Sequence, residues 1–417
     1  MARFTLLIII AAAPVAFAGQ APLTLDSAVE IALSRAPQVT ARTAAHESAQ
    51  SLEASAGRFN DPAIIVGMDN VPVTGPDAFS TTTDSMTMGR VGLTQSFKPA
   101  GMRDGERHRA ASETELAGAE LKATELDVAR ASALAWIRYA ASFAALEDLH
   151  RLEGDVELGA TAARAALKSG RGSAAEALNA EAAVTRLKGR ILELQGELRR
   201  SEAELSRWIG PESLGPPGAM PSMDQLPAPV ESLRSAAHLH AVVLALDARV
   251  EIAKADVELA RAARRPGWSA ELMYGKRGPA FDDMASLLFT IDLPLFARTR
   301  QNPVIAAKSA DLRRVQAERD SEIAMHQAEL DQALVSWEEL GARLQFFERE
   351  QLPLARERSR AALAAFRGDQ SDLRSAIEAY QDETELLIER AQLLGERGAA
   401  WTYLRYLERA GLPEAAP

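Results

Sequence analysis

The sequence predicts a mainly α-helical fold with a small antiparallel β part. Three observations predict it: two helical stretches that run with few breakers over residues 103–168 and 303–366, two short segments in which apolar and polar residues alternate, and the recurrence of this order along the chain. Charged residues make up 25% of the chain and aromatic residues only 5%. An alanine-rich sequence of this composition favours long helices that pack closely along one another.

The two helical stretches are longer than a globular domain is wide. At 1.5 Å per residue each reaches roughly 90–100 Å. Pro353 is the clearest interruption in the second stretch. Bulky residues recur there at three- and four-residue spacing, which predicts coiled-coil-like packing. These residues are Leu330, Leu334, Trp337, Leu340, Leu344 and Phe347.

Two β-hairpins are expected, one within residues 62–97 and one within 267–295. Apolar and polar residues alternate along their strands, so that Leu287 and Phe289 share one face and Thr290 the other. A transmembrane barrel strand has this pattern, with lipid outside and water inside. Trp268 is a candidate for an aromatic belt. A soluble sheet that lies on a helical core has the same pattern, and the strands alone leave both interpretations open.

Four strands in one chain cannot close a barrel, and two hairpins leave strand edges exposed. A barrel therefore requires several copies, which predicts a symmetric homo-oligomer. Four strands in each of three copies make twelve, which lies within the range of membrane barrels. The helices would then continue from the strands as a tube.

The chain contains an internal two-fold repeat. We expect the first repeat at 19–210 and the second at 231–412, joined by a Gly- and Pro-rich linker at 211–230 and followed by a tail at 413–417. Each repeat has the order helix, hairpin, long helix, turn, helix. The two turns have the same layout: Gly170-Arg171-Gly172-Ser173 and Gly368-Asp369-Gln370-Ser371.

Residues 1–18 have the features of a secretory signal peptide. Arg3 precedes an apolar run, and Ala16-Phe17-Ala18 predicts cleavage after Ala18. The mature chain is therefore expected to be exported. The sequence has no cysteine, which excludes disulfides, thiolate chemistry and a lipid anchor on a cysteine. The net charge of −11 argues against nucleic acid as a partner.

The residues predict no catalytic, cofactor-binding or metal site. The sequence has no hydrolase, zinc-protease or phosphate-loop motif, which argues against an enzyme. His238-Leu239-His240 is a possible metal-binding motif, but we interpret these histidines as solvated at a helix start. Thioethers suit Cu(I), yet methionine is also a flexible apolar filler, and we favour that interpretation for the residues near the hairpins. These are Met68, Met86, Met88, Met102, Met273 and Met284.

Several motifs resemble outer-membrane efflux proteins of the TolC family. They are the opening Leu23-Thr24-Leu25-Asp26-Ser27-Ala28-Val29, the hairpin exit Leu93-Thr94-Gln95-Ser96-Phe97 and the two Gly-x-x-Ser turns. The resemblance covers essentially the whole mature chain. The second hairpin exit, Leu293-Pro294-Leu295-Phe296, is similar to the heavy-metal branch of CzcC-like and CusC-like proteins.

The resemblance implies a homotrimer in the outer membrane of a Gram-negative bacterium, with a twelve-stranded barrel in lipid and a long α-helical periplasmic tunnel. It implies docking to a periplasmic adaptor (membrane fusion protein) and an inner-membrane resistance-nodulation-division pump. The expected function is a passive exit duct for heavy-metal cations, with no cofactor. Two alternatives remain: a channel for drug efflux or type I secretion, and a soluble periplasmic coiled-coil adaptor or chaperone.

The resemblance also implies that the two helix–turn–helix tips form the mouth of the tunnel and its adaptor contacts. The residues alone suggest a structural role, in which Gly supplies a positive φ and Ser caps the next helix. The acidic residues among them would attract cations or simply complement a helix dipole. The candidates are Gly170, Ser173 and Glu176 in the first tip, and Gly368, Asp369, Ser371, Asp372 and Arg374 in the second.

Overall fold

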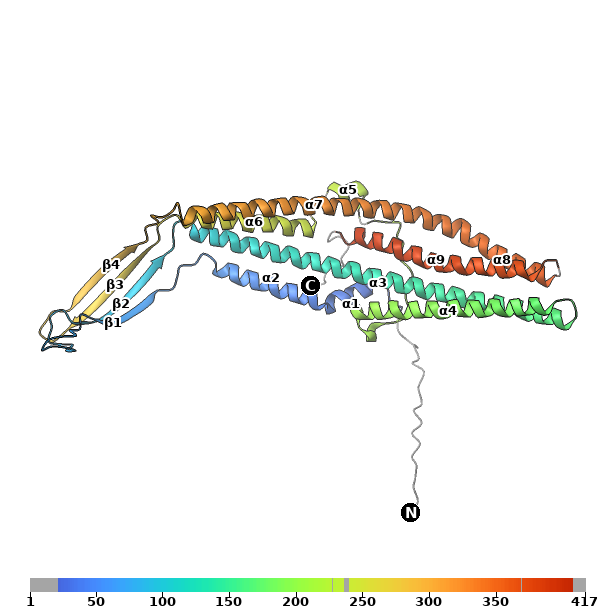
Figure 1. Ribbon diagram of the computed structural model, residues 1–417, viewed down its shortest axis with the longest axis horizontal. Helices are drawn as coiled ribbons and strands as arrows, with labels where there is room; N and C mark the ends of the chain where they lie inside the picture. Colours follow the sequence, from blue (N-terminus) through green and yellow to red (C-terminus); the bar gives the residue numbers. More distant parts are fainter. Residues whose placement is uncertain (1–21, 227, 236–239, 369, 408–417) are drawn as a thin grey trace, which may run out of the picture. The chain divides into compact units, whose positions relative to one another are not determined.

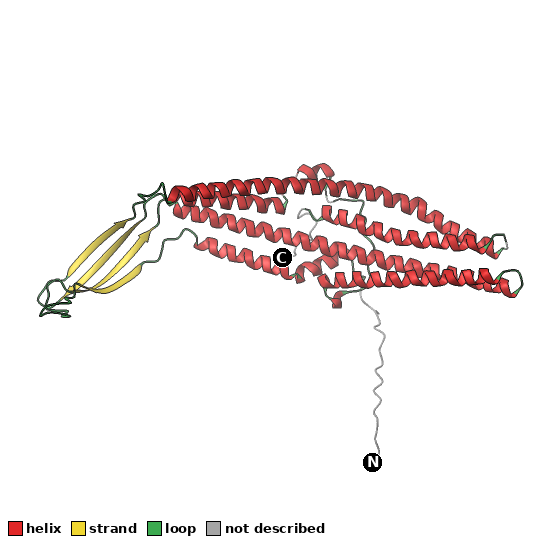
Figure 2. Ribbon diagram, viewed as in Figure 1, coloured by secondary structure: helices red, strands yellow, loops and turns green. Residues whose placement is uncertain are grey.

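The computed structural model describes residues 22–226, 228–235, 240–368 and 370–407. The chain is mostly helical with one small β-sheet, so the predicted fold class is confirmed (Figure 2). The expected signal peptide at 1–18, its cleavage site at Ala18, the tail at 413–417 and Asp369 lie outside the described residues.

The order of elements repeats along the chain (Figure 1). No helix in the described ranges has a stretch long and apolar enough to cross a membrane. The first half contains α1 (Leu25–Arg35), α2 (Pro37–Ser55), β1 (Ala63–Asp69), β2 (Met88–Phe97), α3 (Met102–Lys168), α4 (Ala174–Ile209) and a 3₁₀ turn η1 (Pro211–Ser213). The second contains α5 (Val230–Ser235), α6 (Ala241–Ala262), β3 (Trp268–Arg277), β4 (Met284–Ile291), α7 (Gln301–Phe346), a π turn η3 (Phe347–Gln351), α8 (Leu352–Arg367) and α9 (Leu373–Arg405).

The second long helix is interrupted, in contrast to the first. Between α7 and α8 the backbone widens into the π turn, where the N–H of Leu352 donates to the carbonyl of Phe347 five residues earlier. Pro353 causes this change, because it has no N–H to donate and its ring clashes with the preceding turn. The sequence identified the interruption, and the structure shows that it takes the form of a π turn.

The described residues pack as two compact units, and each unit takes elements from both halves of the sequence. Unit 1 comprises residues Met1–Ala36, Glu125–Val230 and Leu330–Pro417, and unit 2 comprises Pro37–Thr124 and Glu231–Glu329. A repeat therefore does not fold into a separate compact body. The repeat boundaries at 19–210 and 231–412 stay predictions.

The linker lies in unit 1 and is held in place by side chains from the helices. Its backbone carbonyls accept hydrogen bonds from Tyr139 (Gly215 O, 2.9 Å), Trp337 (Met223 O, 2.7 Å) and Trp401 (Gln225 O, 2.9 Å). Burial, with a smaller contribution from the charge of Glu202, raises the pKa of Tyr139 to about 12. The phenol therefore stays protonated as a donor near neutral pH.

In unit 2 the two predicted hairpins join into one antiparallel sheet of order β1-β2-β3-β4. The central pair is β2 with β3, in register from Met88 opposite Arg277 to Phe97 opposite Trp268. Strand β4 ends at Ile291, earlier than the predicted end of the hairpin at residue 295. Pro294 accounts for the early end, because proline has no N–H for the β-ladder.

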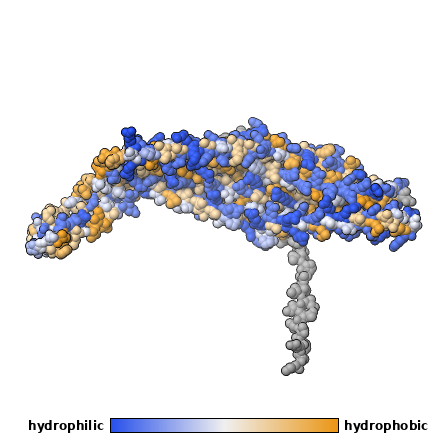
Figure 3. Space-filling view, in the orientation of Figure 1, coloured by the Kyte–Doolittle hydropathy of each residue, from blue (hydrophilic) through white to orange (hydrophobic). Residues whose placement is uncertain are grey.

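One face of this sheet is apolar across all four strands. The register aligns Ile64, Leu93, Leu272 and Leu287 in a single row, whereas the row through Thr94 and Glu271 lies on the other face. The side chains of the apolar row remain 73%, 50%, 59% and 62% exposed in this order. Figure 3 shows hydrophobic patches over the strands. The alternative of a sheet lying on its own helical core is therefore wrong for the described chain.

Charged pairs link neighbouring helices in unit 2. Arg42 of α2 binds Glu120 of α3 at 2.5 Å, and Arg249 of α6 binds the same carboxylate at 2.9 Å. Arg319 of α7 binds Asp247 of α6 at 2.7 Å. Helix α2 buries none of its side chains. Helix α2 therefore associates with α3 mainly through polar contacts, whereas α6 also buries apolar residues, among them Val243, Val250 and Val257.

Candidate functional site

The first tip joins α3 to α4 through a turn that requires glycine. Gly170 has φ = +74°, as the sequence predicts. The backbone N–H groups of Arg171 and Gly172 both donate to the carbonyl of Ala166, at 3.0 and 3.1 Å. A Cβ on Gly172 would lie 3.1 Å from the Cβ of Ala166. The chain therefore reverses here within a very small space.

Ser173 caps α4, and Glu176 completes a capping box with it. The N–H of Glu176 donates to Ser173 Oγ at 3.1 Å, and the N–H of Ser173 donates to Glu176 Oε2 at 2.7 Å. Each side chain satisfies a backbone donor that the first helical turn leaves without a partner. The predicted role of Ser173 as a cap is confirmed, and Glu176 has a local structural role.

The second tip differs from the prediction in two respects. Gly368 has φ = −83°, so it does not supply a positive φ. Ser371 is not the cap, because α9 begins at Leu373 and Asp372 therefore occupies the N-cap position. The carboxylate of Asp372 accepts from the N–H of Ser375 at 3.2 Å and from its hydroxyl at 3.0 Å. Matching the two turns by motif misplaced the helix start by one residue.

The two tips lie at the same end of unit 1 (Figure 1) and share a small apolar cluster. Its buried members come from α3 (Ala160, Ala163), α4 (Ala180) and α9 (Leu373). Ile377 packs against this cluster, while Asp372 and Arg374 are exposed. Alanine side chains allow the helices to approach closely but bury little area, so this cluster contributes little free energy.

The capping geometry predicts that Asp372→Ala loosens the start of α9. Loss of an N-cap costs about 1 kcal/mol, which is roughly a fivefold change in local opening. We expect faster amide hydrogen exchange over residues 373–377 in this variant. Ser371→Ala is the matched control, and we expect it to leave exchange unchanged. Equal effects of the two substitutions would contradict the assignment of Asp372 as the cap.

A seam of small and apolar residues, exposed except at the half-buried Gly189 and Gly196, runs along α4. Its members recur at three- and four-residue spacing, the pattern of a coiled-coil contact face. Leu178 and Leu192 are each 65% exposed, and a Cβ on Gly189 would meet no atom within 4 Å. We name this surface the α4 seam. It consists of Ala175, Leu178, Ala182, Thr185, Gly189, Leu192 and Gly196.

A second exposed seam follows α7 and α8 in unit 1. Its large members, Val335, Phe346 and Leu354, are 58%, 57% and 66% exposed. The spacing is seven or four residues elsewhere but eight from Phe346 to Leu354, where the π turn adds one residue. We name this surface the α7–α8 seam. It consists of Val335, Ala342, Phe346, Leu354 and Ala361.

The exposed face of α9 is polar, which sets it apart from the two seams. It carries Arg374, Glu378, Asp382 and Glu385. Sequence analysis missed the seams because it followed only bulky residues. A count of alanine and glycine at heptad positions would have found the α4 seam. Exposed apolar stripes of this kind mark surfaces that pack against another chain.

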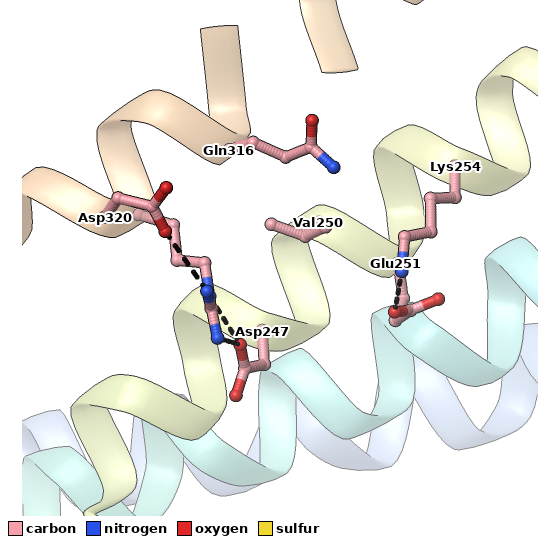
Figure 4. A pocket seen from close by; sticks show the side chains of 7 residues that line it. Asp247, Val250, Glu251, Lys254, Gln316 and Asp320 are labelled. Carbon is pink, nitrogen blue, oxygen red and sulfur yellow. Dashed lines mark hydrogen bonds and ion pairs between the residues drawn. The ribbon is translucent and has the colours of Figure 1, made fainter. Parts of the chain in front are cut away.

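A polar groove of about 600 Å³ lies between α6 and α7 in unit 2 (Figure 4). Arg319 binds Asp247 at 2.7 Å and Asp320 at 3.1 Å, and Lys254 binds Glu251 at 2.6 Å. The hydrogen bond to Asp247 is the main reason that the pKa of Arg319 is raised. These three carboxylates and two cations leave the groove with a net charge of about −1, which offers little attraction to a ligand.

Met273, one of the methionines near the hairpins, is poorly placed to bind a cation. The sulfur of Met273 lies 3.6 Å from Nη1 of Arg90, and a positive guanidinium opposes binding of a cation at this thioether. Among the residues that the structure describes, no three His, Cys, Asp or Glu side chains are placed to hold a metal ion. His238 lies outside the described residues.

No protein-family model matches this sequence, and no curated protein matches it either. Solved structures match over nearly the whole chain. The outer membrane protein VceC from Vibrio cholerae superposes with a TM-score of 0.75 at 19% identity, covering 93% of this chain and 96% of that one. The Campylobacter jejuni CmeC outer membrane channel gives 0.77 at 10% identity, covering 94% and 87%.

CusC, whose structures were solved in a study of folding and transmembrane channel formation, gives a TM-score of 0.74 at 16% identity, covering 91% of this chain and 90% of that one. Its similarity does not exceed that of VceC or CmeC, so the structures do not single out the heavy-metal branch. Likenesses at this level of identity establish the fold. The chain adopts the TolC-like fold of these outer-membrane channels, with four strands and long helices.

Proposed function

We propose that this chain is the outer-membrane channel subunit of a tripartite efflux system and acts as a passive exit duct. The observation that supports this most strongly is the apolar sheet face, which the chain itself leaves exposed. Strands β1 and β4 stand at the two edges of the sheet in the described chain. Lipid tolerates a sheet only when no edge remains open, so further copies must supply the missing neighbours.

A homotrimer meets this requirement. Strand β1 of one copy pairs with β4 of the next, and three sheets of four strands close a twelve-stranded barrel. The exposed seams support the same arrangement for the helices, since the α4 seam of one copy and the α7–α8 seam of the next both need a partner. The helices then line a tunnel on the periplasmic side.

The tips are the proposed docking surface for the periplasmic adaptor, and an inner-membrane resistance-nodulation-division pump supplies the energy. Docking would shift the tips between two helix packings. The shared alanine cluster buries so little area that this shift requires little free energy. The proposed docking and gating residues are Gly170, Ser173, Glu176, Gly368, Asp369, Ser371, Asp372 and Arg374.

The proposed cargo is heavy-metal cations. The support is the second hairpin exit, Leu293-Pro294-Leu295-Phe296, which resembles the heavy-metal branch of the family. Deletion of the gene followed by growth on a panel of metals and antibiotics tests the assignment, with the wild-type gene restored as control. We expect sensitivity to cobalt, zinc, cadmium or copper. Sensitivity to antibiotics alone would favour drug efflux and would rule out the metal assignment.

Export through a signal peptide is part of the proposal. Residues 1–18 would be removed after Ala18, and attachment to the membrane would then depend on the barrel. Mass spectrometry of the mature protein should find Gly19 at its N-terminus. Recovery of the protein in osmotic-shock fluid, rather than in outer membranes, would favour the soluble adaptor or chaperone.

The proposed trimer predicts cross-links between the two seams. The chain has no native cysteine, so any disulfide that forms on oxidation must join introduced cysteines. Leu178 and Ala361 are at similar distances along their helices from the two tips. Leu178 comes five residues after Ser173, and Ala361 comes seven residues before Gly368. We expect Leu178→Cys combined with Ala361→Cys to give covalent dimers and trimers on oxidation, seen on non-reducing gels.

Leu178→Cys combined with Glu378→Cys is the matched control, because Glu378 lies on the polar face of α9. We expect this pair to remain monomeric on the same gel. If only the control pair cross-linked, the proposed contact between seams would be wrong. If neither pair cross-linked and the detergent-free protein were a monomer, the channel itself would be excluded.

A further inference from the structure

Two histidines from different helices of unit 2 meet at hydrogen-bond distance. His240 stands at the N-cap of α6, and His326 lies on α7. Nδ1 of His240 is 2.7 Å from Nε2 of His326, and the two rings are perpendicular. His240 is only 2% exposed, so its interpretation as a solvated histidine is wrong. The contact is therefore built into the packing of α6 against α7.

The geometry of this pair is close to that of two metal ligands. A hydrogen bond between two ring nitrogens requires one of them to carry a lone pair that points at the other. Zinc–nitrogen bonds of 2.0–2.1 Å in a tetrahedral site place two ligand nitrogens about 3.3 Å apart. The observed distance of 2.7 Å needs to widen by about 0.6 Å, and each ring must turn so that its lone pair points at the ion.

We propose that His240 and His326 bind one first-row divalent cation of the zinc class in the place of the shared proton, while the ring that donated this proton takes its other neutral tautomer, with the N–H on its remote nitrogen. Imidazole is a preferred ligand of these ions. Glu322 and Glu329 lie four residues before and three residues after His326, on the same side of α7, and both are exposed. One of these carboxylates, after a rotamer change, and water complete the coordination.

The bound ion would have a structural consequence. It would tie the first residue before α6 to the middle of α7, where charged pairs such as Arg319 with Asp247 otherwise link these helices. Binding only to the folded chain stabilises it by mass action. This ion is resident in the helical part and is distinct from any exported cargo.

Zinc titration of the purified full-length mature protein, freed of metal by a chelator, tests the proposal. Isothermal titration calorimetry should give one ion per chain, and Co²⁺ in place of Zn²⁺ should give the visible absorption of a tetrahedral site. We expect His326→Gln and His240→Gln to weaken binding by about tenfold or more. Zinc should also raise the melting temperature of the wild type but not of these variants.

His150→Gln is the matched control, because His150 lies in unit 1 and pairs with Glu153 at 3.3 Å. We expect it to bind zinc like the wild type. Circular dichroism of each variant without metal verifies that it folds. Failure of the wild type to bind one ion per chain would overturn the proposal, as would unchanged binding by His326→Gln.

A further variant separates this site from the neighbouring motif. If His238→Gln abolished binding while His326→Gln did not, the ion would belong to the His238-Leu239-His240 segment, and the proposed pair would be wrong. The result of the zinc titration does not depend on whether the proposed channel function is correct. Outer-membrane fractionation and cross-linking report on the channel, whereas zinc binding is measured on the purified chain whatever it exports.

Discussion

Leu287→Arg should prevent the proposed assembly of this protein as an outer-membrane trimer. Leu287 belongs to the apolar row that crosses all four strands and is 62% exposed in the single chain. An arginine on the lipid face of a barrel costs about 2–4 kcal/mol near the bilayer midplane, and a trimer incurs this cost in every copy. Membrane fractionation and heat-modifiable mobility on gels measure the loss of the proposed trimer.

The adjacent residue provides the matched control. Ser286 precedes Leu287 on β4, is also exposed in the single chain, and lies on the opposite face of the sheet. In a water-filled barrel this face lines the lumen, so Ser286→Arg should assemble normally. A protein whose sheet met only water would tolerate both substitutions. Equal tolerance would therefore contradict a lipid-facing role for the apolar face.

Trp136→Ala should destabilise unit 1 by about 3–5 kcal/mol. Trp136 on α3 is fully buried, and its indole N–H donates to the carbonyl of Leu23 at 2.9 Å. Leu23 in turn pairs with the linker, where its N–H donates to Pro216 O at 2.9 Å and its carbonyl accepts from the N–H of Gly218 at 2.8 Å. The substitution thus removes a large core side chain. It also removes the hydrogen bond that connects α3 to Leu23 and, through Leu23, to the linker.

Denaturant unfolding of the purified protein, together with hydrogen exchange over α1 and the linker, measures this effect. Trp136→Phe is the control, because it retains most of the ring but not the N–H donor. We expect it to lose only about 1 kcal/mol, the usual net value of one hydrogen bond. If the alanine variant were as stable as the wild type, this cluster would not anchor the linker.

Local periodicity accounts for what sequence analysis predicted correctly. Alternation with period two identified the strand faces, and the absence of breakers identified α3 over nearly its full length. The cap at Ser173 and the positive φ at Gly170 also follow from residue type within a few positions. These features depend on residues that are close together in the sequence, so they can be predicted from the sequence alone.

The helix start at Asp372 shows where such reasoning fails. The two turns look alike as motifs, but the second helix begins one residue later, and the backbone at Gly368 takes an ordinary negative φ. Packing of Leu373 and Ile377 against alanines of α3 and α4 accompanies this register. A contact between residues some two hundred positions apart leaves no signal in the local pattern.

The sequence by itself determined the order of elements, the length of α3 and the two-faced character of the strands, because these depend on residue type and spacing along one segment. Only the tertiary structure decided that both hairpins share one sheet, that α4 and α7–α8 present exposed seams, and that His240 meets His326. The physical reason is that each of these features depends on which segments lie side by side, which is settled by packing over the whole chain.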